Sequence, residues 1–298
     1  MLAPQHLLSI NDLTAAQVMQ LVHQAQHFKR QPPAPLSPPV FAATLFYENS
    51  TRTFMSFQLA AQRLGIFMTP LPVQQASIQK NESFLDTLLT LHAMGIQQLI
   101  IRHDASDPYR AVLPHLPASL HLINAGDGQH EHPSQALLDF MTILEHYPEP
   151  RALRIAIVGD IRHSRVATSF CKLCRLMGLP PVTLISPPLW APQDPTLGTI
   201  TDNLQEGLAD AAVVIVLRVQ RERLEVDAHL DLNAYHAHYA LTLQTLAYAK
   251  PGALILHPGP MNRGIEISHD VAESPQSALL KQVQNGVWMR MAIMSFFA

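Results

Sequence analysis

The chain has 298 residues, which is enough for roughly two domains at about 100–200 residues each. Its 20 Lys and Arg residues against 23 Asp and Glu residues give a formal net charge of −3, and only 14% of the residues are charged. Such a chain lacks the basic field that holds a nucleic-acid backbone, so we expect no nucleic-acid partner. No apolar run approaches the roughly 18 residues that span a bilayer, and the first cationic side chain is Lys29, so we expect no membrane segment, no signal peptide and a cytoplasmic location.

The cysteines and histidines do not form a recognisable metal motif. Cys171 and Cys174 stand three residues apart in SFCKLCRLMG, and no second pair completes a zinc site. We expect buried thiols on one face of a helix; the alternative, a redox pair, requires an exposed and electropositive thiol. The 16 histidines are scattered, with no H-x-x-x-H pair beside a recognisable third ligand, so we predict no metal site.

The first half of the chain predicts alternating strands and helices. Apolar residues at helical spacing from Val18 to Phe28 predict an amphipathic helix behind the start signal Asn11-Asp12, and QPPAPLSPPV ends it. From Val40 onward short apolar runs alternate with helical patterns, as in βαβ units. The predicted elements are a strand over 40–46, a helix after Ser50, strands over 97–101 and 121–124, and a helix from about Pro133 to Tyr147.

The second half repeats this pattern after a proline-containing break, YPEPRAL, at residues 147–153. We expect strands over 154–160, 181–185, 211–218 and 253–257, and a final helix from about Gln276 to Phe297. The predicted fold class is α/β, with two doubly wound parallel-sheet lobes. We place one domain at residues 1–147 and the other at 148–276, with the C-terminal helix at about 277–298 packing back on the first. The site is expected in the cleft between the lobes, at the carboxyl ends of their strands.

The segment after the first strand predicts an anion pocket. In YENSTRTFMSF the hydroxyls of Ser50, Thr51 and Thr53 bracket Arg52 at the predicted start of a helix. Hydroxyls, a guanidinium and the free N–H groups of a helix N-terminus suit a phosphate group. The alternative is an ordinary helix cap beside a solvated arginine. The Walker pattern GxxxxGK[ST] is absent, so nucleotide hydrolysis is not indicated.

A second cationic group comes from other strand ends of the same half. Arg102 follows QQLII, Lys80 lies in QASIQKNESFLDT, and His132 and Gln135 flank a proline and a serine at a helix start in QHEHPSQ. We expect His132 to donate to a carbonyl oxygen and the Gln135 carboxamide to accept from an amide NH₂; simple capping by His132 is the alternative.

Arginines follow two strands of the second half. RIAIVGDIRHSR lacks G-x-G-x-x-G, which disfavours a dinucleotide site, but it ends in Arg165. The next strand leads into Arg218 and Gln220 in LRVQRER. Two guanidiniums at neighbouring strand ends suit a dicarboxylic substrate; a pair of surface ion-pairing arginines is the alternative.

Four motifs in this order and spacing, STRT, HPSQ, RVQ and HPGPMNRGIEI, closely resemble the catalytic chains of the aspartate carbamoyltransferase family, from the first helix to the last. The resemblance implies transfer of a carbamoyl group from carbamoyl phosphate to the α-amine of L-aspartate, in pyrimidine biosynthesis, without metal or organic cofactor. It assigns the phosphate and carbamoyl group to Ser50, Thr51, Arg52, Thr53, Arg102, His132 and Gln135. It assigns aspartate to Lys80, Arg165, Arg218, Gln220, Gly259 and Pro260, and counts Arg52, Lys80, Arg102, His132 and Gln135 as catalytic.

The resemblance also implies an assembly. In this family the loop that contains Lys80 enters the site of the neighbouring subunit, so a homotrimer with shared active sites is expected, with regulatory or dihydroorotase-like subunits left open. Glu48 resembles the residue that bridges to Arg165 and Arg223 when the lobes close.

Alternatives and departures remain at this point. A carbamoyltransferase for another amino acid, such as ornithine, is the second enzyme hypothesis, although ornithine-type relatives carry HCLP where this chain has HPGP at 257–260. An inactive scaffold is the third, and it would lack the phosphate ligands. The family's usual arginine after STRT is Phe54 here, and its usual glycine after the loop lysine is Asn81. Neither change removes a substrate ligand, so we predict activity.

Overall fold

The computed structural model describes residues 4–73, 82–219 and 231–298 and divides into two compact units. The first unit comprises the chain up to Leu138 together with Val283–Ala298, and the second comprises Asp139–Gln282. The divisions fall inside two helices, α4 (Pro133–Leu144) and α11 (Leu279–Phe296), so the chain passes between the units through helices. The sequence-based boundary at residues 147–148 stays a prediction.

The N-terminal segment begins with a short 3-10 turn, η1 (Ile10–Asp12), which Ser9 caps, followed by α1 (Ala15–Arg30). The start signal at Asn11-Asp12 was wrong for α1, because Thr14 is its N-cap and forms a capping box with Gln17. Asp12 instead closes the preceding turn.

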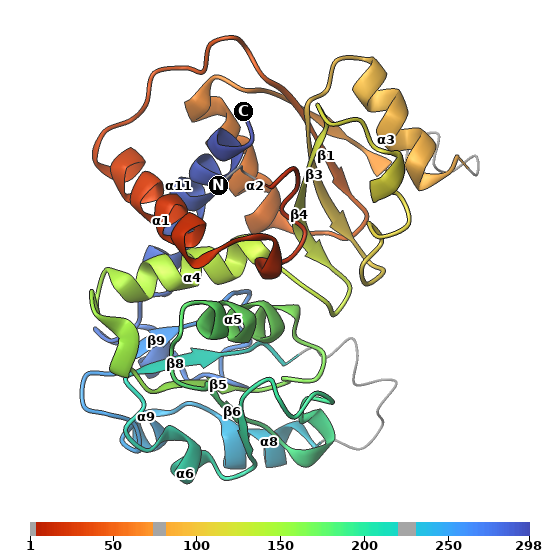
Figure 1. Cartoon of the computed structure of the whole chain (residues 1–298). Helices are drawn as coiled ribbons and strands as arrows, with labels where there is room; N and C mark the ends of the chain where they lie inside the picture. The colour runs from red at the N-terminus through yellow and green to blue at the C-terminus, as the bar shows by residue number, and fades with distance from the viewer. Residues whose placement is uncertain (1–3, 74–81, 220–230) are drawn as a thin grey trace. The chain divides into compact units, whose positions relative to one another are not determined.

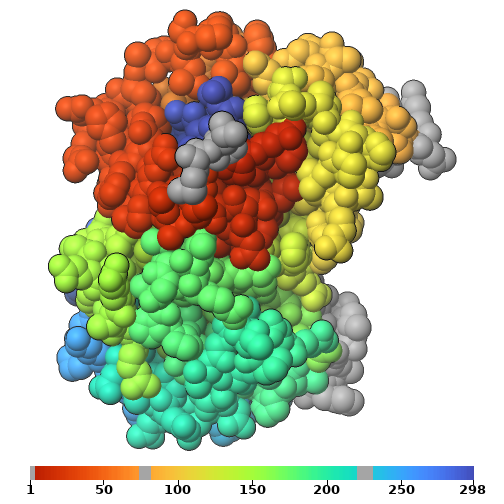
Figure 2. Space-filling model, in the orientation of Figure 1, coloured from red at the N-terminus to blue at the C-terminus, as the bar shows by residue number. Residues whose placement is uncertain are grey.

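The first unit is built on a four-stranded parallel sheet in the order β2-β1-β3-β4. Its strands are β1 (Phe41–Phe46), β2 (Phe67–Leu71), β3 (Gln98–His103) and β4 (His121–Asp127). Leu7 forms a parallel bridge with Ile123, so the N-terminal segment extends the sheet beyond β4. Figure 2 shows these N-terminal residues, in red, at the surface beside the blue C-terminal end of the chain. The ring of His121, the first residue of β4, contacts that of Phe297.

Helices cover both faces of this sheet (Figure 1). α2 (Thr51–Leu64) and α11 lie with α1 on one face, and α3 (Phe84–Ala93) lies on the other. Alternate residues of β1 explain the layering: Ala43 and Leu45 pack with Leu88 of α3, and Ala42 and Thr44 therefore face the other way. A 3-10 turn, η4 (Leu113–His115), precedes β4.

The second unit has a five-stranded parallel sheet in the order β7-β6-β5-β8-β9. Its strands are β5 (Ile155–Val158), β6 (Thr183–Ile185), β7 (Thr199–Thr201), β8 (Val213–Val216) and β9 (Leu254–Leu256). β5 and β8 are neighbours in register, with Val158 opposite Val216. Every residue of β5, β8 and β9 is buried, as expected for parallel strands covered on both faces.

Helices again cover this sheet. α5 (Arg165–Leu176) lies on one face, and α6 (Leu204–Leu208), α8 (Leu232–Tyr239) and α9 (Leu243–Leu246) lie on the other in Figure 1. The core of that second face includes Val158, Val214 and Ile255, packed against Leu208 and Leu246. The remaining short elements are η5 (Pro150–Ala152), η6 (Pro188–Trp190) and α10 (His269–Ala272).

The predicted α/β class with parallel sheets is confirmed, and the sequence missed two edge strands for identifiable reasons. β2 contains Pro70, which cannot donate to a ladder and is tolerated because β2 lies at the sheet edge. β7 has three residues, of which two are exposed, so no apolar run marks it. Edge strands of this kind are held by one neighbour and have little hydrophobic signal.

Candidate active site

The predicted anion motif lies at the N-terminus of α2, directly after β1. Ser50 is the N-cap, but its side chain makes no capping hydrogen bond. Thr51 and Arg52 are exposed and Thr53 is buried. The simple-cap alternative therefore fails for Ser50, whose hydroxyl is not used to close the helix. Together the hydroxyls, the guanidinium and the positive helix end form a surface suited to a phosphate group.

Arg102 lies at the same edge of the sheet, because it is opposite Phe46 in the register of β1 and β3. Its Nη2 is 3.0 Å from Oε2 of Glu48, and its Nη1 donates to the carbonyl of Ala125 at 3.3 Å. Its side chain is only 12% exposed, so these contacts hold the guanidinium in a defined orientation at the strand end. The bridge from Glu48 to Arg165 and Arg223 stays a prediction.

His132 and Gln135 lie at the start of α4, which follows β4. The carbonyl of His132 accepts the backbone N–H of Gln135 at 3.0 Å, and both side chains are largely buried. The chain therefore brings them to the same sheet edge as Arg102 and the α2 motif, as the sequence predicted.

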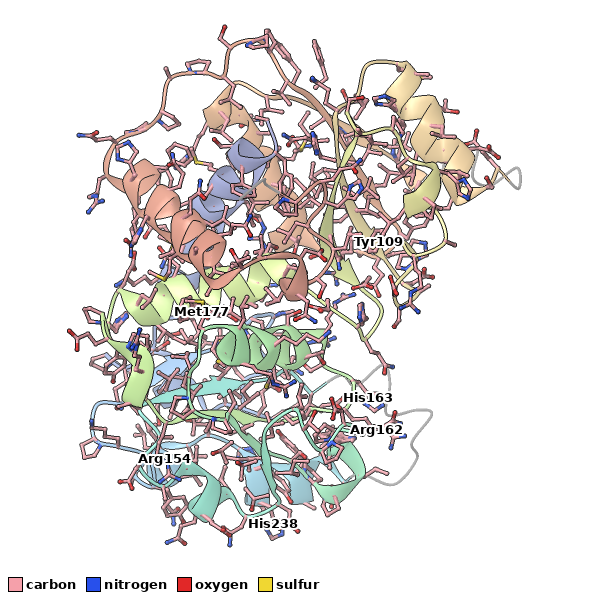
Figure 3. All side chains as sticks on the ribbon, viewed as in Figure 1. Tyr109, Arg154, Arg162, His163, Met177 and His238 are labelled. Carbon is pink, nitrogen blue, oxygen red and sulfur yellow. The ribbon has the colours of Figure 1, made fainter. Side chains whose placement is uncertain are left out.

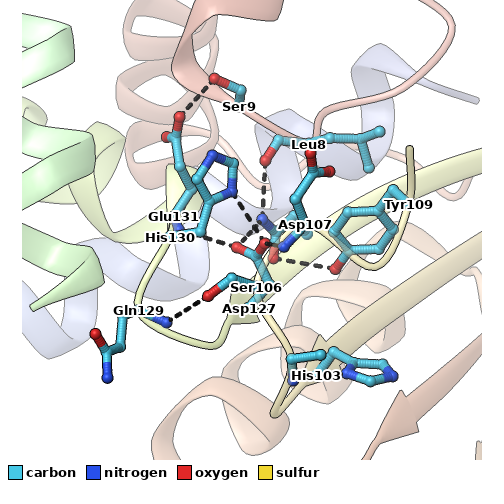
Figure 4. Close-up of polar contacts among 12 residues, drawn as sticks. Leu8, Ser9, His103, Ser106, Asp107, Tyr109, Asp127, Gln129, His130 and Glu131 are labelled. Carbon is cyan, nitrogen blue, oxygen red and sulfur yellow. Dashed lines mark hydrogen bonds and ion pairs between the residues drawn. The ribbon is translucent and has the colours of Figure 1, made fainter. Parts of the chain in front are cut away.

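A buried carboxylate that the sequence analysis missed fixes the turn before His132 (Figure 4). Oδ1 of Asp127 accepts from Asn124 Nδ2 and from the backbone N–H of Glu131, each at 2.9 Å. Its Oδ2 accepts from the backbone N–H of Asp107 at 2.7 Å and from His130 Nδ1 at 3.0 Å. Burial alone would raise the pKa of Asp127, but the hydrogen bonds from His130, Asn124 and Asp107 lower it overall.

Glu131, which directly precedes His132, is also buried and was also missed. Its Oε1 accepts from the Ser9 hydroxyl at 2.5 Å (Figure 4). Its Oε2 accepts from the backbone N–H of Ile10 at 3.2 Å. Asn124 Nδ2 donates to the carbonyl of Leu8 at 2.8 Å. The N-terminal segment thus holds the loop that contains His132 in place through hydrogen bonds. The signal available in the sequence was an acidic residue within a short histidine-rich loop between a strand and a helix.

In the second unit, Arg165 is the first residue of α5. Ser164 caps the helix by accepting from the N–H of Ala167 at 3.1 Å. Before it, buried Asp160 accepts from His163, whose Nδ1 is 2.9 Å from Oδ1. Figure 3 labels His163 beside Arg162 in the segment that leads into α5. This Asp160–His163 pair closes the turn that leads into Arg165 and α5.

Arg218 follows β8, and β8 is the neighbour of β5, so Arg165 and Arg218 come from adjacent strand ends as predicted. Both are partly buried. The turn after β5 approaches the end of β8 closely: Gly159 has φ +131°, and a Cβ there would lie 3.0 Å from Cβ of Leu217. Only glycine fits this approach without strain.

Gly259 and Pro260 follow β9 at the same edge of the sheet, with Gly259 at φ +66°. Lys80 and Gln220, and also Asn81 and Arg223, lie outside the described residues.

Other predicted features take no part in this arrangement. Cys171 and Cys174 are buried on α5, and burial raises the pKa of Cys171 to about 12 and that of Cys174 well above its usual value. The buried-thiol prediction is confirmed. Phe54 packs edge-on against Phe46, with ring centroids 5.6 Å apart. Within the described part of the chain, no three His, Cys, Asp or Glu side chains gather to hold a metal ion. None of the helices in that part combines the length and the hydropathy of a membrane span.

Two family models cover nearly the whole chain. Residues 5–145 match the carbamoyl-phosphate-binding domain of aspartate/ornithine carbamoyltransferases, and residues 151–297 match their Asp/Orn-binding domain. The chain belongs to the aspartate/ornithine carbamoyltransferase family. The carbamoyltransferase match assigns the anion motif to the first domain and the two arginines to the second, as the resemblance implied.

Relatives similar over nearly the whole chain are named as aspartate carbamoyltransferases. The chain is 48% identical to an aspartate carbamoyltransferase catalytic subunit of Legionella pneumophila, over 97% of this carbamoyltransferase and 98% of that protein. It is 41% identical to the same subunit of Limosilactobacillus reuteri, over 97% and 94%.

Solved structures of aspartate transcarbamoylase are also similar to this chain. An aspartate transcarbamoylase of Trypanosoma cruzi in complex with carbamoyl phosphate and aspartate has a TM-score of 0.86 at 30% identity, covering 98% of this chain and 96% of that one. The same enzyme with N-(phosphonacetyl)-L-aspartic acid gives 0.87 at 31%, covering 98% and 95%. An ornithine carbamoyltransferase of Thermus thermophilus, at 22% identity and 0.87, covers 99% of both chains and shows the shared fold alone.

Proposed function

We propose that this chain is an aspartate carbamoyltransferase catalytic chain, which transfers the carbamoyl group of carbamoyl phosphate to the α-amine of L-aspartate. The products are N-carbamoyl-L-aspartate and phosphate, and the step belongs to pyrimidine biosynthesis. The observation that carries the proposal is the near full-length match to relatives named for aspartate, at 48% identity. The strand-end chemistry of both units supports it.

The first unit binds the carbamoyl donor. Ser50, Thr51, Arg52 and Thr53 hold the phosphate at the N-terminus of α2, where the Ser50 hydroxyl makes no capping bond. Arg102, held by Glu48, contacts both the phosphate and the carbonyl oxygen. A guanidinium already oriented by a carboxylate loses little freedom when it binds an anion.

His132 and Gln135 act on the carbamoyl group itself. His132 polarises the carbonyl by donating a hydrogen bond to its oxygen, and Gln135 holds the amide. Their backbone is fixed at the first turn of α4, so the donor is in place before charge develops on the oxygen. Removing one such donor typically costs about 10²–10³ in rate.

The second unit binds the acceptor. Arg165 and Arg218, at adjacent strand ends, each pair with a carboxylate of aspartate, and Gln220, Gly259, Pro260 and Lys80 complete its binding. The neutral α-amine attacks the carbamoyl carbon, an oxyanion forms, and the phosphate leaves and takes the amine proton. Orientation of two bound substrates can supply roughly 7–11 kcal/mol of the barrier reduction.

The assembly we propose is a homotrimer in the cytoplasm, in which Lys80 of one chain serves the site of its neighbour. The relatives are named as catalytic subunits, which supports an oligomer. Mixing Lys80→Ala chains with Arg52→Ala chains tests this directly, because mixed trimers contain sites that hold both native residues. Recovery of activity is expected; inactivity of verified mixed trimers would contradict the shared site.

The acceptor assay tests the function. The purified chain is given carbamoyl phosphate with L-aspartate or with L-ornithine, and carbamoyl-aspartate and citrulline are measured. We expect carbamoyl-aspartate to form at a kcat/KM at least about 100-fold above that for citrulline, because a diacid site leaves the ornithine amine facing arginine. Faster turnover of ornithine would reverse the proposal.

A further inference from the structure

A buried hydrogen-bond network in the second unit centres on the carboxylate of Glu266. The Glu266 and His257 side chains are each 0% exposed, and His257 Nε2 is 3.2 Å from Oε1 of Glu266. The same Oε1 accepts the backbone N–H of Asn262 at 2.5 Å, and Oε2 accepts the backbone N–H of Val219 at 3.4 Å. The carboxylate thus accepts from three donors in two segments, the segment after β8 and the loop after β9.

The hydrogen bonds define the state of the imidazole. Nδ1 of His257 accepts the backbone N–H of Gly259 at 2.9 Å, so Nδ1 carries the lone pair. The proton is therefore on Nε2, and His257 donates it to Glu266 as a neutral ring. A protonated ring would point a second N–H at the Gly259 N–H. His257 consequently links the Glu266 carboxylate to the turn at Gly259.

These contacts join two parts of the proposed acceptor site. Val219 stands between Arg218 and Gln220 after β8, while Gly259 and Pro260 follow β9. Asn262 makes a second connection, because its Nδ2 donates to the carbonyl of Val219 at 2.9 Å. Both polar groups of the Val219 backbone are thereby tied to the loop after β9.

The surroundings keep water away from this link. Val219 packs with Trp190 and Tyr235, each 1% exposed. Burial, and then the negative charge of Glu266, raise the pKa of the Tyr235 hydroxyl. In such a setting each hydrogen bond to the charge is strong and a lost one is costly.

We propose that Glu266 is a positioning residue, which holds the Arg218–Val219 segment and the His257–Asn262 loop in register and so sets the affinity for the amino-acid substrate. It touches no substrate itself; it acts through Val219, Asn262 and His257. The inference rests on the proposed function, because it concerns the acceptor half of that reaction.

The charge and not only the size of the side chain is required. In Glu266→Gln, an NH₂ placed at Oε2 faces the N–H of Val219, and an NH₂ placed at Oε1 faces the N–H of Asn262 and Nε2–H of His257. Either orientation sets donor against donor, so one of the two segments is released. Glu266→Gln is therefore expected to loosen the acceptor half with almost no change in volume.

The test is steady-state kinetics on the full-length chain, with direct binding of inorganic phosphate as a second readout. For Glu266→Gln we expect the KM for aspartate to rise at least about 10-fold, with the Kd for inorganic phosphate within about two-fold of wild type. Glu273→Gln is the matched control, because Glu273 is 59% exposed and pairs with Arg263 in the same unit. It should leave both quantities unchanged.

Two substitutions of His257 separate its hydrogen bond to Glu266 from its hydrogen bond to Gly259. The Oδ1 of an asparagine at 257 reaches the position of Nδ1 and accepts from Gly259, but nothing replaces Nε2–H. His257→Asn should therefore raise the aspartate KM by less than Glu266→Gln, and His257→Ala should match or exceed Glu266→Gln. Should Glu266→Gln fail to fold, the two His257 variants still decide the question by their order.

Three results would overturn the inference. They are an unchanged aspartate KM in Glu266→Gln, an equal weakening of phosphate and aspartate, and equal effects of the two His257 variants. Failure of the proposed function is a different result, since the wild-type chain would then produce no carbamoyl-aspartate at all.

Discussion

Replacing the buried carboxylate of Asp127 by an amide tests whether the turn before His132 is held as the structure indicates. Four donors face the two oxygens of Asp127, two at each oxygen. In Asp127→Asn the NH₂ takes one of those places and cannot accept. If it replaces Oδ1, it faces Asn124 Nδ2 and the N–H of Glu131; if it replaces Oδ2, it faces the N–H of Asp107 and His130.

The second orientation is the cheaper one. The His130 side chain is 36% exposed, so its ring can shift its proton to Nε2 and accept from the new NH₂. The N–H of Asp107 is then the one donor left without its acceptor, which costs about 1–3 kcal/mol. Loss of charge on the remaining hydrogen bonds brings the total to roughly 2–4 kcal/mol.

Thermal unfolding measures this cost. For a folding unit of roughly 150–250 residues about 2–4 °C corresponds to 1 kcal/mol, so the unfolding midpoint of the first unit should fall by roughly 4–16 °C. The kcat should also fall, because Glu131 and His132 follow the turn, while phosphate affinity is kept. Asp104→Asn, at a neighbouring carboxylate that is 72% exposed, is the control. A midpoint within 2 °C of wild type would refute the reasoning.

Three further predictions concern stability and reactivity. Burial, and then His121, lower the pKa of His6 from 6.5 to about 4, and its Nδ1 accepts from the N–H of Leu122. Because the unfolded chain takes up the proton first, stability should fall as the pH drops from 6.5 toward 4. If the melting temperature of His6→Asn falls as steeply with pH in this range as that of wild type, the prediction is contradicted. Cys171 and Cys174 should react with a thiol reagent roughly 100-fold more slowly in the native chain than in denaturant, and fast native labelling would exclude the buried state. Gly128→Ala should destabilise the chain by about 1–3 kcal/mol in denaturant unfolding, because Gly128 has φ +41° and the new Cβ would lie 2.7 Å from the N of Ser106. Gly95→Ala should cost less, because nothing lies within 4 Å of its Cβ.

Much of this fold follows from local pattern. The strands of both sheet centres were predicted because buried parallel strands are continuous apolar runs, as in IAIV and VVIV. The edge strands β2 and β7 were missed, since β2 contains Pro70 and β7 is a three-residue strand in which Thr199 and Ile200 are exposed. The true N-cap of α1, Thr14, was missed because Asn11-Asp12 is equally typical of a helix start, whereas both residues lie inside a 3-10 turn that Ser9 caps.

The candidate site likewise contains side chains that the sequence predicted and side chains that it missed. The side chains that we propose to contact substrate lie in short motifs next to strand ends, so Arg52, Arg102 and Arg218 could be proposed from order and spacing. Asp127, Glu131 and Glu266 act through backbone donors that come from other segments, and no spacing in the sequence announces those partners. Acidic residues directly beside the recognised motifs are the sequence signal that would have pointed to them.

In the proposed reaction one group of residues binds phosphate and a second group binds a diacid. Calorimetric titration with N-(phosphonacetyl)-L-aspartic acid and with inorganic phosphate tests it most directly, on wild type, Arg52→Ala and Arg218→Ala. Both variants should weaken the bisubstrate compound at least about 100-fold, and Arg52→Ala alone should weaken phosphate. Unchanged binding of the bisubstrate compound to Arg218→Ala, or equal loss of phosphate in both variants, would contradict the account.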